Sequence, residues 1–274
     1  MTAGADRPLP SFRKPPLHEV ALSVQFESLP DLTAAHIGQF WGRLRKRFPI
    51  VEEQPPLPPI PIERDGVHVG QELVISTDPP RPRIWLLDSE RRELIQIQHD
   101  RFTRNWRKSG TEDRYPRYED HIRPNFEHDY QAFCDFVRDE GIGDVNVLQC
   151  EVSYFNQIRT VEGVWTRPDD MHHAFCLYDP VETGSTAVSL EGFQLRQSFR
   201  MTAENEFKGR LYAEIGPGQV GGESVIQYHL TARGHPGTNS AEDALAFLDL
   251  GRESIVRYFA ASTSPAMRQE WEIE

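Results

Sequence analysis

Two segments of the chain alternate apolar and polar residues with a period of two, the pattern of a β-strand that buries only one face. The segments are residues 17–28 and 147–158. Their apolar sides consist of Val20, Leu22, Val24 and Phe26 in the first, and Leu148, Cys150, Val152, Tyr154 and Ile158 in the second. The residues between them are mostly polar, so both segments predict strands with one buried and one wet side.

Three further segments place apolar residues at helical spacing. They are residues 31–48, 118–140 and 240–259. Asp31 or Thr33 caps the first, Gly141 ends the second, and Ser240 opens the third in a capping-box pattern. Short runs bounded by turn residues predict the other strands. These strands are residues 72–77, 83–88, 93–99, 175–178, 187–199, 210–215 and 225–231, with the glycine-rich residues 216–222 as the turn between the last two.

The order of these elements predicts an α+β fold made of antiparallel sheets, each backed by a long helix. Because strand, meander and long helix occur twice, we also hypothesise a pseudo-duplication. The expected organisation is a flexible tail over residues 1–12, an N-terminal α+β half over 13–143 and a C-terminal α+β half over 144–274. The two halves either form separate domains or share one core.

Residues 55–61 read Pro-Pro-Leu-Pro-Pro-Ile-Pro. Prolines lack the backbone N–H, so this run is neither a helix nor a central strand and is expected to be extended polyproline structure. Such a segment serves either as a docking ligand for a partner or as a rigid connector that covers a sheet edge. The surrounding strand signals favour the connector.

Charge and cysteine content exclude several classes of protein. The chain has 30 Lys and Arg against 42 Asp and Glu, a net charge of -12, which disfavours a generic nucleic-acid-binding protein. Three widely spaced cysteines do not form a disulfide framework. The chain has neither an apolar run of about 20 residues nor a signal-peptide pattern. We therefore expect a cytoplasmic protein with no membrane contact.

The most distinctive candidate surface is residues 99–108, where four cations, two aromatic residues and an asparagine occur together. The candidate residues are Arg101, Arg104, Asn105, Trp106 and Arg107. They either bind a phosphate and stack on a base, or pair with the protein's own carboxylates, and the acidic composition favours the second. An exposed Trp–Arg pair is also typical of a protein interface.

Tyr154 and Asn156 form a second candidate, because both are expected on the inward side of one strand. A buried asparagine must be hydrogen-bonded, so Asn156 is either a structural bracket or a ligand contact in a cavity. The bracket is favoured.

Motifs for catalysis or metal binding are weak. Residues 169–173 hold two aspartates and two histidines, but adjacent histidines diverge on a strand, and a solvated turn is favoured. No nucleophile elbow, zinc-protease motif or phosphate loop occurs. We expect no catalytic residue, no metal and no cofactor.

Several segments together resemble a sporadically distributed family of bacterial proteins with no assigned function. The segments are KPPLHEVALSVQF, QIQHDRFTRNWRK, YPRYEDHIRPNF, CEVSYFNQI and LGRESIVRYFAASTSPAMRQEW, in this order along the chain. The resemblance implies an accessory bacterial gene and assigns no functional residue.

These observations lead to a non-catalytic protein-interaction or assembly module, with a protein partner or a second copy of the chain as its ligand. The alternative is a small-ligand or nucleotide-binding protein with a cavity between sheet and helix, lined by Tyr154, Asn156 and arginines. A metal-dependent hydrolase built on His172 and His173 ranks third, and direct nucleic-acid binding ranks last.

Overall fold

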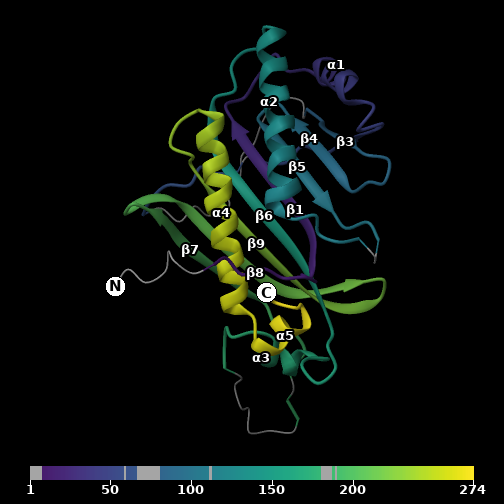
Figure 1. Ribbon diagram of the computed structural model, residues 1–274, viewed down its shortest axis with the longest axis vertical. Helices are drawn as coiled ribbons and strands as arrows, with labels where there is room; N and C mark the ends of the chain where they lie inside the picture. Colours follow the sequence, from purple (N-terminus) through teal and green to yellow (C-terminus); the bar gives the residue numbers. More distant parts are fainter. Residues whose placement is uncertain (1–7, 59, 67–80, 111–112, 180–186, 189) are drawn as a thin grey trace.

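The computed structural model describes residues 8–58, 60–66, 81–110, 113–179, 187–188 and 190–274 of the chain. Its centre is one nine-stranded antiparallel sheet with the strand order β2-β3-β4-β5-β1-β6-β9-β8-β7 (Figure 1). The strands are β1 Leu17–Phe26, β2 Ile50–Gln54, β3 Arg83–Leu87, β4 Glu93–Gln98, β5 Arg101–Arg107, β6 Val147–Arg159, β7 Leu195–Ala203, β8 Glu206–Val220 and β9 Glu223–Gly234.

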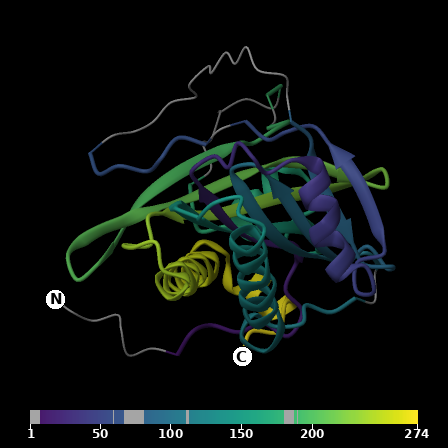
Figure 2. The same ribbon diagram turned by 90° about the horizontal axis from the view of Figure 1, so that it is seen from above.

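Two long helices lie on the same face of this sheet (Figure 2). The helices are α1 Ala34–Leu44, α2 Arg123–Asp139, α3 Met171–Ala174, α4 Ala241–Ser262 and α5 Pro265–Glu270, with a π-helical turn Tyr118–Ile122 before α2. Helix α4 lies along β6 and β9, and α2 covers β5 through contacts of Phe126, Tyr130 and Phe133 with Phe102. The prediction of an α+β fold is confirmed. No helix in the described part of the chain is both long and apolar enough to cross a membrane.

Helix α1 begins as its sequence predicts. Thr33 is the N-cap, and its side chain accepts a hydrogen bond from the His36 amide. The apolar stripe of α1 then reaches α2 at one end of the sheet, where Phe40 packs on Phe133 and Phe136.

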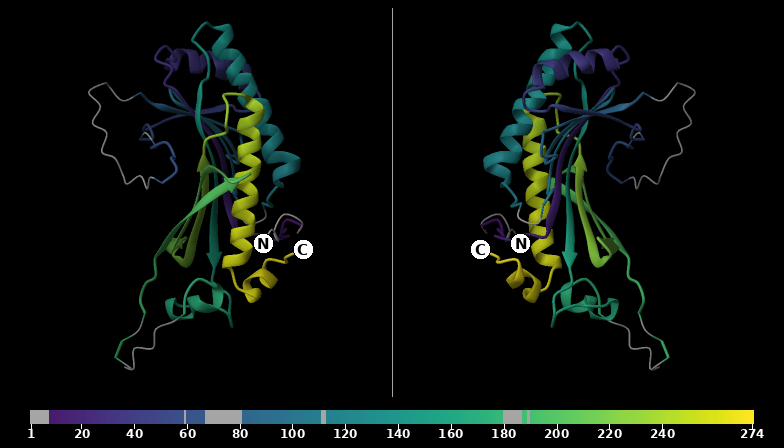
Figure 3. Two further views of the ribbon diagram at one scale, coloured as in Figure 1. Left: turned by 90° about the vertical axis from the view of Figure 1, so that its left-hand side faces the viewer. Right: turned by 90° about the vertical axis from the view of Figure 1, so that its right-hand side faces the viewer.

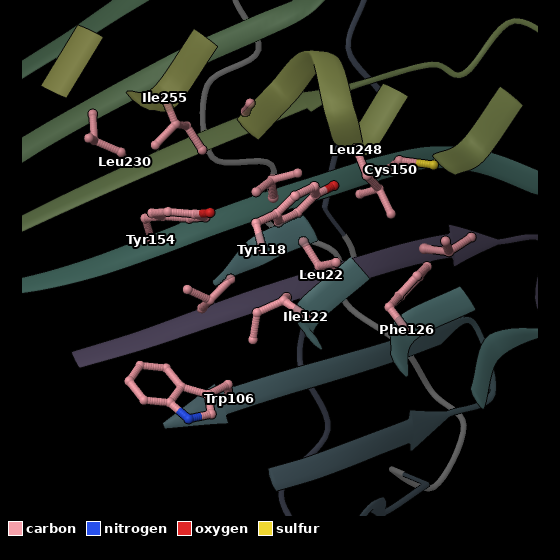
Figure 4. Close-up of a cluster of buried hydrophobic side chains, with 14 of the residues drawn as sticks. Leu22, Trp106, Tyr118, Ile122, Phe126, Cys150, Tyr154, Leu230, Leu248 and Ile255 are labelled. Carbon is pink, nitrogen blue, oxygen red and sulfur yellow. The ribbon is translucent and has the colours of Figure 1, made fainter. Parts of the chain in front are cut away.

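One continuous cluster of buried apolar side chains lies between the sheet and these helices (Figure 4). It includes Leu22 of β1, Phe126 of α2, Cys150 of β6 and Leu248 of α4, so it contains residues from both halves of the chain. Gly251 of α4 marks a close approach, since a Cβ there would lie 3.1 Å from Ala232 and Val152.

Several predictions about the sheet differ from the structure, among them the strand expected at residues 187–199, which begins only at Leu195 as β7. The expected separate sheets are one sheet, because β1 and β6 pair along most of their length. Residues 101–107 were expected as a surface segment and form the whole of β5, an interior strand. Residues 175–178 form no strand; Phe175 makes only an isolated bridge to Thr263. The predicted strand 72–77 lies outside the described residues.

The predicted hairpin of the second half is longer than expected. Strands β8 and β9 continue through Gly216, Pro217 and Gly218, and the turn is confined to Gly221 and Gly222. Both turn glycines have positive φ, of 60° and 86°, a conformation that other residues adopt at a cost.

Residue 12 was expected to belong to a flexible tail but is packed into the fold. Phe12 is buried against Phe259 and Trp271, and it bridges to Ile273 near the C-terminus. The side views show α4 running the length of the sheet, with the C-terminus on its helical side (Figure 3). The two termini of the fold are thus joined by packing that no local pattern encodes.

Candidate functional site

The sheet has a second face, opposite the helices, that is lined by polar side chains. Strand alternation places most apolar residues of β1, β4, β5, β6, β8 and β9 toward the helices and most of their polar residues on this polar face. Those that are buried there are Ser23, Gln25, Gln96, Gln98, Arg101, Thr103, Asn105, Gln149, Ser153 and Arg210. Buried polar groups require partners, so the contacts of this face indicate what it is built to hold.

The proline-rich segment crosses the polar face instead of covering a sheet edge (Figure 2). We call its described residues, 55–58 and 60–65, the strap. Gln98 of β4 exchanges two hydrogen bonds with the main chain of Leu57: the Leu57 amide donates to Oε1 at 2.9 Å, and Nε2 donates to the Leu57 carbonyl at 3.2 Å. This is the pairing that a neighbouring strand would provide.

Two more glutamines continue this contact further across the sheet, on β1 and β6. Gln25 of β1 donates to the Ile60 carbonyl at 3.2 Å. Gln149 of β6 donates to the carbonyls of Ile60 and Pro61, and its Oε1 accepts from the Glu63 amide at 3.2 Å. Glutamine amides thus supply both donors and acceptors to the extended main chain, and the Pro61 carbonyl is among the groups that they bind.

The acidic residues at the end of the strap meet arginines of the same face. Glu63 is buried, and its carboxylate accepts from Arg210 at 2.5 Å and from the Tyr212 hydroxyl at 2.6 Å. Burial and the Glu63 hydrogen bond raise the pKa of Tyr212 to about 12. Asp65 accepts two hydrogen bonds from Arg200 of β7, at 2.8 and 2.6 Å, which hold the pKa of its carboxyl below the ordinary value.

A hydrogen-bond chain lies on the polar face beyond the strap. Gln96 donates to Asn105 at 2.7 Å, and Asn105 donates to Glu19 at 2.6 Å. Gln96 in turn accepts from Arg83 and from the Trp85 indole. Burial raises the pKa of the Glu19 carboxyl. These side chains thus hold one another through hydrogen bonds.

The structure divides the candidate residues of β5 between two faces. Arg101, Asn105 and Arg107 lie on the polar face, whereas Arg104 and Trp106 point toward the helices. Trp106 is only 4% exposed, so the expectation of an exposed Trp–Arg pair is wrong. Successive side chains of a strand point to opposite faces of the sheet, so these five residues cannot form one surface.

Arg104 belongs to a buried ion network instead of a surface. Its Nε lies 2.9 Å from Asp129, a carboxylate with 0% exposure that also accepts two hydrogen bonds from Arg47. Its guanidinium also pairs with Glu93 at 2.7 Å, and Glu93 contacts the His121 ring at 2.6 Å. This network joins β5 to α2 and to the end of α1, so its role is to hold the helices on the sheet.

Trp106, Tyr154 and Asn156 meet at the other end of the helical face. Tyr115 packs edge-on against the Trp106 ring, and its hydroxyl lies 3.1 Å from that of Tyr154 (Figure 4 labels Trp106 and Tyr154). Asn156 donates to the Tyr228 carbonyl at 3.0 Å, which is the structural bracket that its sequence position favours.

A cavity of about 70 Å³ lies beside Tyr154 and Asn156, with Arg117 and Arg252 in its wall. It has room for a few water molecules, whereas pockets for drug-sized ligands have about 300–1,000 Å³. The small-ligand alternative stays a prediction, and the polar face is the stronger candidate site.

The rings of His172 and His173 lie close together, with centroids 3.8 Å apart, and do not diverge as expected for a strand. The His172 ring bonds to the Asp169 carbonyl at 2.8 Å, and the two residues lie in a helical turn instead of around an ion. No group of three or more His, Cys, Asp or Glu side chains arranged to hold a metal occurs among the described residues. Burial raises the pKa of Cys134 to about 11, which disfavours its thiolate.

Sequence reasoning missed the strap-binding glutamines. Gln25 and Gln149 occupy the polar sides of the two alternating strands, and Gln98 ends a third. Their sequence signal was a long amide where a solvent-facing strand more often has a charge, but only the tertiary structure shows that an extended segment lies over them. Comparison of the chain with protein-family models, with curated proteins and with solved structures found no match in any of the three.

Proposed function

We propose that this protein is a non-catalytic interaction module that binds an extended, proline-containing segment of a partner protein on the polar face of its sheet. One observation carries the proposal: Gln25, Gln98 and Gln149 hydrogen-bond the main chain of the strap from three strands. Contacts to the main chain do not depend on which side chains the bound segment carries. The strap is then the chain's own ligand for a face that accepts related segments.

Two physical features of the polar face support binding in trans. A proline-rich segment is already extended when free, so it loses little conformational entropy when it docks. The arginines that receive Glu63 and Asp65 add charge complementarity, which favours an acidic partner segment and disfavours a basic one. The strap is tethered, so its effective concentration at the polar face is high. A partner segment displaces it only if its own concentration or affinity is high enough to overcome this advantage.

The test is the affinity of a fluorescent peptide, residues 54–66 of this chain, for two kinds of full-length variant. Glu63→Gln with Asp65→Asn weakens the strap and leaves the face intact, and it should raise peptide affinity about tenfold over the wild type, measured by anisotropy. Gln98→Ala with Gln149→Ala, added to that background, should abolish binding. Equal, weak binding by the wild type and the strap variant would contradict the proposal.

The controls separate specific docking from non-specific attraction. Gln227→Ala removes a glutamine from the same face at the far end of β9 and should leave the affinity unchanged. A scrambled peptide of the same composition should not bind. If Gln98→Ala with Gln149→Ala does not fold, Gln98→Ala alone removes the two hydrogen bonds to the Leu57 main chain and tests the same face.

We also propose that the two halves of the chain arose by duplication. Each half begins with a strand that pairs with the last strand of its own meander, β1 with β5 and β6 with β9, and each meander is followed by a long helix. In an experimentally determined structure, β1, β3–β5 and α2 should superpose on β6–β9 and α4. A different path of α2 over its strands would contradict the duplication.

A further inference from the structure

Arg101 lies in the row of the polar face that binds the strap. Its register partners are Gln98 on β4 and Gln25 on β1, so its strand position is between the glutamine that binds Leu57 and the glutamine that binds Ile60. A segment that spans these two glutamines must cross the strand that carries Arg101.

Arg101 differs from the other buried arginines in its partners. In the described part of the chain, Arg104 pairs with Asp129 and Glu93, and Arg210 pairs with Glu63. Arg101 is 5% exposed, and its Nη2 has no hydrogen-bond partner; no carboxylate of the described residues forms an ion pair with it. A buried cation without a counter-ion is unfavourable, so the site gains most from an anion.

The carboxylates nearest to Arg101 are already engaged. Asp100 accepts a hydrogen bond from Gln98 at 2.9 Å, and Glu151 accepts from Arg233 at 2.6 Å and from Ser153 at 3.1 Å. Burial is the main cause that lowers the pKa of Arg101, and it exceeds the opposing effect of these two acids. Arg101 therefore lacks a counter-ion, and a further carboxylate would supply one.

The sequence of the strap explains why this need is unmet in the free protein. Where the strap carries an acid, an arginine receives it, as Glu63 with Arg210 and Asp65 with Arg200. Between Leu57 and Ile60, however, the sequence is Pro-Pro, which offers neither a carboxylate nor an N–H. The strap thus satisfies every part of this row except the arginine.

We propose that Arg101 is a specificity-determining residue that binds an acidic side chain of the partner segment, at the position that Pro58 holds in the strap. This proposal rests on the proposed peptide-binding function and deepens it. The preferred ligand is an extended segment with an Asp or Glu three residues before its counterpart of Pro61. The carboxylate would replace the missing counter-ion and pair with the free guanidinium edge.

The test compares matched peptides of residues 54–66 that carry Glu or Gln at position 58. In the Glu63→Gln, Asp65→Asn background, the Glu peptide should bind about tenfold to a hundredfold tighter than its Gln counterpart. Adding Arg101→Met should remove this preference, whereas Arg107→Met, on the same strand and face, should retain it. Free acetate should compete only in large excess.

The outcomes distinguish the two proposals. If none of the peptides binds, the peptide-binding function is wrong. If the Glu and Gln peptides bind equally, or if Arg101→Met retains the preference, that function stands and the role of Arg101 is overturned.

A second measurement needs no ligand. Because Arg101 is buried without a counter-ion, Arg101→Met should leave the thermal midpoint of the free protein unchanged or raise it. A clear fall, beyond that of Arg107→Met, would show that the free protein already satisfies the arginine, and this result would overturn the proposal.

Discussion

Asp129 shows at the scale of one residue how a charge on a helix can serve the core. From the sequence it belongs to an ordinary charged face of α2, but it has 0% exposure and accepts hydrogen bonds from Arg104 and Arg47. Its neighbour Asp135 pairs with Arg138 in solvent. The same residue type therefore has two roles on one helix, depending on whether the side chain faces the core or the solvent.

We expect Asp129→Asn to lower the free energy of unfolding by about 3–5 kcal/mol, because it leaves two arginines without their counter-ion. Asp135→Asn is the matched control and should change stability by less than about 1 kcal/mol. Urea denaturation followed by circular dichroism measures both. Similar effects of the two substitutions would contradict a structural role of the buried network.

Two histidines, His18 and His229, make the stability of the protein depend on pH. Burial lowers the pKa of His18, with Lys108 and Arg107 adding to the effect, and burial lowers the pKa of His229 against the opposing effect of Glu214. In the unfolded chain both rings titrate near pH 6.5, so the unfolded state binds more protons below that value. Stability is therefore full above about pH 7 and falls as the pH drops through about 6.5.

The free energy of unfolding of the wild type should decrease between about pH 7.5 and about pH 5.5, a window chosen above the ordinary carboxyl range. The double variant His18→Gln, His229→Gln should show a smaller decrease, measured by urea denaturation at both pH values. His128→Gln, at an exposed position, controls for the loss of a histidine. An unchanged decrease in the double variant would contradict this assignment.

At the scale of elements, two helical glycines have opposite effects on stability, and their sequence contexts do not reveal which is which. Gly251 of α4 faces the sheet, where a Cβ would lie 3.1 Å from Ala232 and Val152. Gly42 of α1 has no atom within 4 Å of an added Cβ. The first glycine permits α4 to approach β6 and β9, and the second only weakens its helix.

Gly251→Leu should therefore destabilise the protein by about 1–3 kcal/mol, because the larger side chain forces α4 away from the sheet. Gly42→Ala should stabilise it by about 0.5–1 kcal/mol through helix propensity. Thermal and urea unfolding give both values. A neutral Gly251→Leu would show that α4 is not held at this distance.

At the scale of the whole molecule, the pairing of β1 with β6 joins the two halves in one sheet, and the buried apolar cluster includes residues of both. Phe12 and Trp271 add a contact between the ends of the chain. Separation at residue 143 would expose the edges of β1 and β6 and open the core between α2 and α4.

We expect the full chain to unfold in one cooperative transition, with equal calorimetric and van't Hoff enthalpies. Residues 13–143 and 144–274, expressed separately, should lack cooperative unfolding and should regain it when mixed. Two independent transitions in the full chain, or stable separate halves, would show two domains rather than one.

The alternating pattern of residues 17–28 and 147–158 was sufficient to predict two amphipathic strands, because side-chain direction in a strand has a fixed period. Helix caps such as Thr33 and the apolar stripe of α2 were equally local, so the α+β class followed from sequence. The placement of residues 101–107 did not follow from sequence, because a local cluster of cations does not reveal which of its side chains face the helices. Only tertiary structure decided that β1 and β6 join the halves in one sheet and that the strap lies across Gln25, Gln98 and Gln149. These contacts link residues far apart in the chain, and their free energy depends on burial and partners that no short segment specifies.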